Sequence, residues 1–232
     1  MTITSRADDL GYEQLPRLMQ LMTGDEKHTN AATSTLDVLW VLYDRVLRVD
    51  PQRPDDPGRD RFFLSKGHGP MAYYATLAAK GFIDERALAG WGTHDSALGH
   101  HPDRVLVPGV EISSGSLGHG LPLAVGAALG LRAQGSDARV FVLVGDAELD
   151  EGSNQEAIEL AGFLALANLT LVVVDNASAS YRERGHLALR LRLEGWRAHV
   201  VDGRDHAALE QALTQRDVRP AAVVAEVEEK WS

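Results

Sequence analysis

Two short polar segments each follow an apolar run, and together they could bind a cation. Gly145-Asp146 follows the run 140–144, and Asn176 follows the run that ends at Asp175. Asn176 lies 30 positions after Asp146, and the residues between them include a stretch of helical character. Two strands joined by a helix form a right-handed crossover, so their carboxyl ends lie side by side. Because Mg²⁺ prefers carboxylate, amide and phosphate oxygens, this spacing predicts a metal–diphosphate anchor at one edge of a sheet.

Apolar periodicity predicts the elements that must hold these residues in place. Thr33-Ser34 is expected to cap a helix, and the Pro- and Asp-rich stretch 51–58 is expected to be a loop. Helices are expected over 10–22, 36–47, 70–80, 119–134, 153–167, 186–195 and 206–216. Strands are expected over 140–145, 170–175, 198–202 and 221–227. This alternation predicts an α/β fold, with a parallel sheet flanked by helices on both faces.

The composition limits the kind of protein. At 232 residues the chain can bury a full core, and we expect a single domain over 1–232, with two small domains as the alternative. The formal net charge of −10 argues against nucleic-acid binding, which needs a basic face. Cysteine is absent from the sequence, which excludes thiolate chemistry. The sequence contains no apolar signal segment and no run of membrane-spanning length, so we expect a cytoplasmic location and no membrane association.

The residues resemble those of one enzyme family. Gly-Asp followed about 30 residues later by Asn is the thiamine-diphosphate signature, and this version resembles that of transketolases. Three further segments agree with that family in order and spacing: the Ser-Lys-Gly-His stretch in 61–69, the Gly-His-Pro-like loop 99–103 and the glycine turn in 108–120. The resemblance runs from about residue 12 to 230. It implies the thiamine-diphosphate-binding (PP-type) fold.

By this resemblance, three residues hold a Mg²⁺ ion that anchors the cofactor. They are the Asp146 carboxylate, the Asn176 side-chain amide and the backbone carbonyl of Ser178. Alanine replaces the usual family glycine at the position after each of the first two ligands, Ala147 and Ala177. The alternative for Asp146 is a role as a helix N-cap.

The resemblance also implies a set of cofactor contacts around a glycine turn that precedes a helix, where backbone N–H groups are free. The alternative is a tight loop without a ligand. His119 stands where the family usually has Gln. The implied cofactor-binding residues are His68, Gly115, Ser116, Leu117, Gly118, His119, Gly145, Asp146, Ala147, Glu148, Asn176 and Ser178.

Three residues resemble the family's catalytic groups. His68 and His101 match histidines near the diphosphate and the sugar, where imidazole can donate hydrogen bonds and move protons. His100 occupies the glycine position of the Gly-His-Pro loop and could substitute for His101. Glu151 matches a carboxylate that reaches across a subunit contact, with an exposed helix-start glutamate as the alternative.

The resemblance implies transfer of a two-carbon ketol unit from a ketose phosphate donor to an aldose acceptor. The glutamate that activates the cofactor belongs to a pyrimidine-binding domain, which follows the present region in full-length family members. We therefore expect this chain to be the N-terminal subunit of a split transketolase, active only with a C-terminal partner in a heterotetramer of two copies of each. The alternatives are a split decarboxylase or deoxyxylulose-phosphate-type synthase, and a noncatalytic scaffold.

Departures from the family pattern bear on the sugar donor. Asp25 falls where a substrate-binding histidine is expected, and His28 could compensate for it. The stretch 177–196 is shorter than usual. Because unpaired polar groups discriminate strongly between sugars, we expect a specialised ketose donor, such as an amino- or deoxy-sugar phosphate of a biosynthetic pathway.

Overall fold

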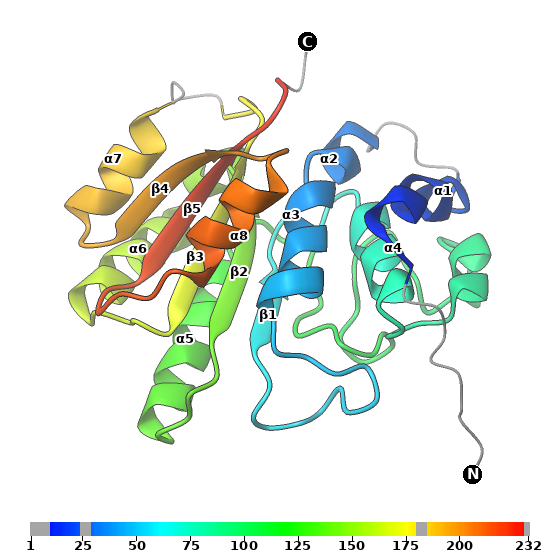
Figure 1. Ribbon diagram of the computed structural model, residues 1–232, viewed down its shortest axis with the longest axis horizontal. Helices are drawn as coiled ribbons and strands as arrows, with labels where there is room; N and C mark the ends of the chain where they lie inside the picture. The colour runs from blue at the N-terminus through cyan, green and yellow to red at the C-terminus, as the bar shows by residue number, and fades with distance from the viewer. Residues whose placement is uncertain (1–9, 24–28, 180–184, 230–232) are drawn as a thin grey trace.

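A five-stranded parallel sheet organises the part of the chain that the structure describes. The computed structural model describes residues 10–23, 29–179 and 185–229. The strand order is β1-β2-β3-β5-β4, and every pairing is parallel (Figure 1). The strands are β1 (Arg61–Leu64), β2 (Val140–Gly145), β3 (Leu169–Asp175), β4 (Arg197–Asp202) and β5 (Ala221–Glu226). The four predicted strands are confirmed to within one residue at each end, whereas β1 was not predicted.

The helices of the second half of the chain agree with the predicted pattern. In the first half, the predicted helices are divided into shorter α-helices and 3₁₀ or π turns. The α-helices are α1 (Leu15–Gln20), α2 (Thr29–Thr33), α3 (Leu36–Val41), α4 (Met71–Ala79), α5 (Gly120–Ala133), α6 (Gly152–Phe163), α7 (His186–Leu193) and α8 (His206–Thr214). Short 3₁₀ or π turns are η1 (Tyr12–Gln14), η3 (Leu42–Val46), η4 (Glu85–Gly90) and η5 (Ala147–Asp150). In the described ranges, no helix is both long and apolar enough to cross a membrane.

Two of the predicted helix boundaries are wrong for identifiable reasons. The N-cap of α3 is Thr35, one residue after the predicted Thr33-Ser34, and no side chain makes a capping hydrogen bond there. The hydroxyls of Ser34 and Thr35 instead donate back to the carbonyls of Ala31 and Ala32, each at 2.9 Å. Helix α6 ends at Phe163, four residues before the predicted end. Two residues after this end, Ala165 has a φ of +46°, which turns the chain out of the helix toward β3.

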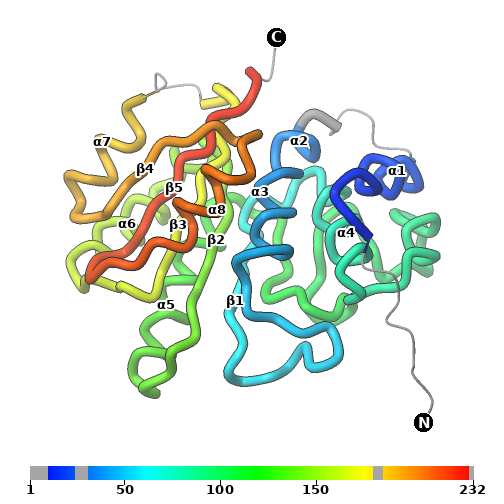
Figure 2. The backbone as a smooth tube through the Cα atoms, in the orientation of Figure 1, coloured from blue at the N-terminus to red at the C-terminus, as the bar shows by residue number. Residues whose placement is uncertain are grey.

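Helices cover both faces of the sheet, which confirms the predicted α/β architecture (Figure 2). Strand residues Phe62, Leu64 and Phe141 pack with α3, α4 and α8 in one apolar core. The intervening residues Phe63 and Val140 point the other way and pack with α5, α6 and α7 in a second core. Since successive strand residues face opposite sides, burial on both faces explains why the strands are apolar without alternation.

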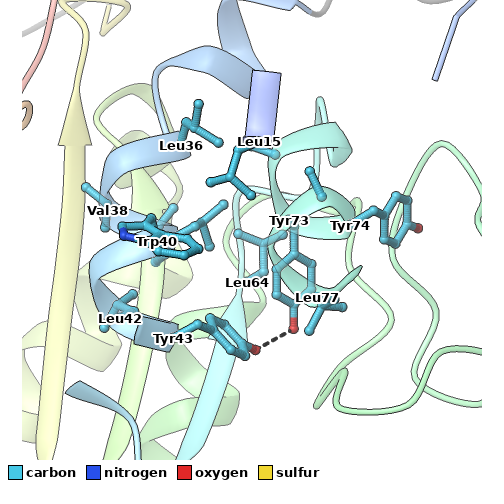
Figure 3. Packing of buried hydrophobic residues seen from close by; sticks show 14 of the residues in the cluster. Leu15, Leu36, Val38, Trp40, Leu42, Tyr43, Leu64, Tyr73, Tyr74 and Leu77 are labelled. Carbon is cyan, nitrogen blue, oxygen red and sulfur yellow. Dashed lines mark hydrogen bonds between the residues drawn. The ribbon is translucent and has the colours of Figure 1, made fainter. Parts of the chain in front are cut away.

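Aromatic packing joins the helices beside β1 to that strand. The hydroxyls of Tyr43 and Tyr73 lie 3.1 Å apart in a fully buried hydrogen bond (Figure 3). The ring of Phe62 packs against both tyrosines, with centroid distances of 5.6 and 5.7 Å. Tyr74, the next residue of α4, donates its hydroxyl hydrogen to the Gly99 carbonyl at 3.0 Å. Helix α4 thus links the β1 strand to the loop that contains the predicted histidines.

Candidate functional site

The predicted strand ends meet at one edge of the sheet. Ser65, Asp146 and Asn176 directly follow β1, β2 and β3, which are neighbours in the sheet. The β2–β3 register pairs Gly145 with Val174, and the Asp146 N–H donates to the Val174 carbonyl at 3.1 Å. The adjacency of these polar side chains therefore follows from the parallel pairing, as the sequence predicted.

The Asp146 carboxylate organises the chain beyond β3. It is 1% exposed and accepts hydrogen bonds from the Ser178 N–H and hydroxyl, both at 2.6 Å, and from the Ala179 N–H at 2.8 Å. Although Asp146 stands at the N-cap position of η5, its side chain makes no capping hydrogen bond there. The helix-cap alternative is therefore wrong, and the carboxylate faces the segment after β3.

The buried amide of Asn176 has an oxygen that suits a cation. Asn176 is 4% exposed, and its Oδ1 has no hydrogen-bond partner among the described residues. A buried acceptor without a partner is costly unless a ligand satisfies it. No cluster of three or more His, Cys, Asp or Glu in the described ranges could hold a metal. A cation here would therefore depend on amide and carbonyl oxygens beside the single carboxylate, a donor set that suits Mg²⁺.

The two alanines that replace family glycines differ in backbone conformation. Ala147 begins η5 and has no positive φ, so its methyl group is tolerated there. Ala177 has a φ of +54°, in the left-handed region that glycine adopts more readily. Its N–H donates to the Asp175 carboxylate at 3.0 Å, which helps to hold the turn between two predicted metal ligands.

We expect Ala177→Gly to raise the free energy of unfolding by about 0.5–1 kcal/mol, because glycine removes the left-handed cost of about 1–2 kcal/mol but restores freedom to the unfolded chain. Ala147→Gly is the matched control, and it should lower stability by about 0.5–1 kcal/mol because φ is ordinary there. Urea unfolding of both variants tests this. Equal destabilisation by the two substitutions would contradict the strain at position 177.

The glycine turn before α5 is closely packed on its own protein. Gly115 has a φ of +136°, and a Cβ there would lie 2.9 Å from the His101 ring. Gly118 has a φ of +83°, and a Cβ there would lie 2.8 Å from that of Glu151. Within the described residues, the N–H groups of Ser116 and Leu117 have no hydrogen-bond partner. A turn with free N–H groups before a helix suits the predicted diphosphate.

The structure separates the two histidines of the Gly-His-Pro-like loop. The rings of His68 and His101 pack edge to face with centroids 4.9 Å apart, which brings the two predicted catalytic residues together. The His100 ring packs instead on Trp91, also at 4.9 Å. The Gly99 carbonyl accepts hydrogen bonds from Tyr74 and from the Trp91 indole, and these fix the loop. This arrangement favours His101 over His100 as the residue that faces the site.

Two predicted residues lie at the exposed rim of the turn. Glu151 is exposed, and its side chain lies beside Gly118. Ser153, two residues later, donates its hydroxyl hydrogen to the Gly118 carbonyl at 2.7 Å. His119 is exposed at the N-terminus of α5 and makes no capping hydrogen bond. Both side chains are accessible to a partner or ligand. Asp25 and His28 lie outside the described residues.

Sequence reasoning missed two residues of the β1 end that organise the site. The Ser65 hydroxyl donates to the buried carboxylate of Glu148. Lys66 Nζ donates to the Ala31 carbonyl and the Ser34 hydroxyl, each at 2.8 Å, and so connects the sheet edge to the end of α2. Burial raises the pKa of Glu148, although the hydrogen bond from Ser65 opposes that shift. The available sequence signal was the Ser65 hydroxyl directly after a strand. The sequence did not show that Glu148 is its hydrogen-bond partner.

Comparison with known proteins agrees with this geometry. Residues 19–225 match the family described as "Transketolase, thiamine diphosphate binding domain". A protein of Rhodococcoides fascians named "Ferredoxin fas2" is 53% identical over 221 residues, which are 94% of this chain and 73% of that protein. The present chain contains no cysteine, the residue that binds iron–sulfur clusters in ferredoxins.

Two further proteins carry transketolase names. One of the subunits of the apulose-4-phosphate transketolase of Actinobacillus succinogenes is 46% identical over 145 residues, 62% of this chain and 52% of that protein. The solved transketolase of Leishmania mexicana superposes with a TM-score of 0.74 at 29% identity, over 88% of this chain and 37% of that one. The chain thus spans about half of the first protein and little more than a third of the second. With a family match over most of its length, the chain belongs to the transketolase thiamine diphosphate binding domain family.

Proposed function

We propose that this chain is the cofactor-binding subunit of a two-subunit transketolase. It would transfer a two-carbon ketol unit from a ketose phosphate to an aldose acceptor with thiamine diphosphate and Mg²⁺. The observation that carries this proposal is the meeting of the Asp146 carboxylate and the unpartnered Asn176 amide oxygen at one sheet edge. The glycine turn and the His68–His101 pair complete the site.

Different residues of this chain would bind the metal, the diphosphate and the sugar. Asp146, Asn176 and the Ser178 carbonyl would hold Mg²⁺, and the free N–H groups of the glycine turn would bind the diphosphate. When bound, thiamine diphosphate supplies an electron sink for the two-carbon unit. His68 and His101 would orient sugar hydroxyls and move protons near neutral pH.

A second polypeptide would complete the active site. The Actinobacillus relative is named as one subunit of its transketolase, which supports a split arrangement. The partner would carry the pyrimidine-binding domain and its activating glutamate, with two copies of each chain in the complex. Exposed Glu151 beside the glycine turn would contact the partner. The single domain over 1–232 and the cytoplasmic location stay predictions.

The donor would be a specialised ketose phosphate. The name of the apulose-4-phosphate relative supports a donor outside the common sugar phosphates. The test is to co-express the chain with the partner subunit encoded by the neighbouring reading frame and to purify the complex. Ketose donors, including xylulose 5-phosphate and apulose 4-phosphate, are then assayed with thiamine diphosphate and Mg²⁺. Preference for xylulose 5-phosphate would contradict the specialised donor. Carbon dioxide release would favour the decarboxylase alternative, and association without cofactor binding would favour the scaffold.

We expect His101→Asn to lower kcat/KM of the complex by about 10- to 100-fold, because a hydrogen bond to a charged group such as a phosphate contributes about 1.5–3 kcal/mol. His100→Asn is the matched control, since its ring packs on Trp91 instead of His68. That control should stay within about 2-fold, as is usual for surface positions. The reverse order of effects would mean that His100 is the functional histidine.

A further inference from the structure

Glu148 is a buried carboxylate with three donors among the described residues, and these donors come from three different segments. It is 2% exposed and lies on η5, directly after β2. One oxygen accepts the Ser65 hydroxyl and the Gly118 N–H, the latter at 3.0 Å. The other oxygen accepts the Gly145 N–H at 3.4 Å. A buried carboxylate is costly unless it is hydrogen-bonded, and here its bonds join β1, β2 and the glycine turn.

Ser65 extends this network to the first turn of α5. Its hydroxyl oxygen accepts the Gly120 N–H at 3.0 Å while its hydrogen is donated to Glu148. A Cβ at Gly120 would lie 2.3 Å from that of Ser65, so the helix start lies directly on the end of β1. The pair Glu148–Ser65 thus satisfies two N–H groups, those of Gly118 and Gly120, at the start of α5.

The backbone of Glu148 is also fixed. The Asn154 side-chain amide donates to the Glu148 carbonyl at 2.8 Å, and Asn154 is itself fully buried. The Glu151 N–H donates to the same carbonyl at 3.1 Å. Because hydrogen bonds fix both the backbone and the carboxylate of Glu148, this residue is a rigid spacer between the sheet edge and the turn.

We propose that Glu148 is a positioning residue that sets the place of the glycine turn 115–118 relative to Asp146. It acts through Ser65 and Gly118 and does not touch the cofactor, which differs from the direct contact expected from the sequence. This inference rests on the proposed function. Ser116 and Leu117 of the turn have N–H groups that are free among the described residues. These groups can donate to a diphosphate held at Asp146 only if the turn keeps its present position relative to the end of β2.

Two readouts test the proposal, and one of them does not depend on the cofactor. In Glu148→Ala, amide hydrogen exchange in the peptide 115–120 should be at least about 10-fold faster, because the Gly118 N–H loses its acceptor and Ser65, which holds the Gly120 N–H, loses its own partner. In the complex with Mg²⁺, the Kd for thiamine diphosphate should rise by about 10- to 100-fold, as is typical when a supporting hydrogen bond around a site is removed. Titration calorimetry measures the second quantity.

The conservative variant separates positioning from a direct charge effect. In Glu148→Gln, one amide oxygen can still accept from Ser65 and Gly118, and only the longest bond, to Gly145, is lost. Its Kd should therefore stay within about 3-fold of the original. Loss equal to that of Glu148→Ala would overturn the proposal, because the negative charge itself would then be required. Glu156→Ala is the matched control, because Glu156 is an exposed glutamate on α6 that has no part in this network and should change neither readout.

Ser65→Ala provides a second route if Glu148→Ala does not fold. It removes the link to Gly120 but keeps the bond from Gly118, so exchange should rise at Gly120 and the Kd should rise less than for Glu148→Ala. A folded variant of either kind with unchanged exchange in 115–120 would refute the positioning role. Absence of Mg²⁺-dependent cofactor binding by the original complex would instead refute the proposed function, and the exchange result would still stand.

Discussion

Asp146→Asn should weaken Mg²⁺-dependent binding of thiamine diphosphate by about 100- to 10,000-fold. The substitution keeps the size of the side chain but removes the charge that a divalent cation needs, and loss of one partner from a buried charge pair costs about 3–5 kcal/mol. Asp146 is the only carboxylate in the proposed ligand set, so neither Asn176 nor the Ser178 carbonyl can replace its charge. Titration of the two-subunit complex with cofactor, at saturating Mg²⁺, measures the change.

The fold should survive this substitution. An asparagine oxygen can still accept one of the hydrogen bonds from the Ser178 or Ala179 N–H groups, which hold the segment after β3. The unfolding midpoint without Mg²⁺ should therefore change little. Asp150→Asn is the matched control, the same substitution four residues later on η5 at a partly exposed position. Equal cofactor affinity in Asp146→Asn and the original chain would show that the cation is bound elsewhere.

The sheet could be predicted from the sequence because it is buried on both faces. Strands β2, β3 and β5 are continuous apolar runs bounded by polar residues, and their limits were predicted to within one residue. Strand β1 was missed because it has only four residues and begins with a half-buried arginine. Its strand character depends on pairing with β2 over Arg61–Leu64, a long-range contact that no local pattern reveals.

Some features of the candidate site could likewise be predicted from the sequence, and others could not. That Asp146 and Asn176 lie side by side follows from the crossover topology alone. The left-handed backbone at Ala177 and the choice between His100 and His101 do not follow from it. The latter depends on Trp91 and Tyr74, which hold the Gly99 carbonyl. The direction of the Glu148 carboxylate depends on Ser65, 83 positions away. Side-chain partners of this kind require the tertiary structure.

A second buried carboxylate, at the opposite end of the sheet, should have the largest effect on stability. Asp60 is 0% exposed and accepts hydrogen bonds from the backbone N–H groups and guanidinium groups of both Arg48 and Arg139. Asp60→Asn should lower the free energy of unfolding by about 3–5 kcal/mol, because it leaves the buried Arg139 without its counter-charge. The matched control is Asp137→Asn, which removes the other partner of Arg48. Because the Asp137 side chain is 86% exposed, that change should cost about 0–1 kcal/mol.

The same carboxylate should make stability depend on acid pH. Burial alone would raise the pKa of Asp60, but the hydrogen bonds from Arg139 and Arg48 outweigh it and hold the pKa below its usual value. Because the folded pKa is the lower one, Asp60 contributes stability above the unfolded pKa of about 3.9, and this contribution is lost as pH falls through the folded pKa. Urea unfolding at pH 7 and at a series of values below 4 should therefore show a steeper loss for the original chain than for Asp60→Asn. Parallel pH profiles would mean that another carboxylate controls acid unfolding, because the variant has no group at position 60 left to titrate.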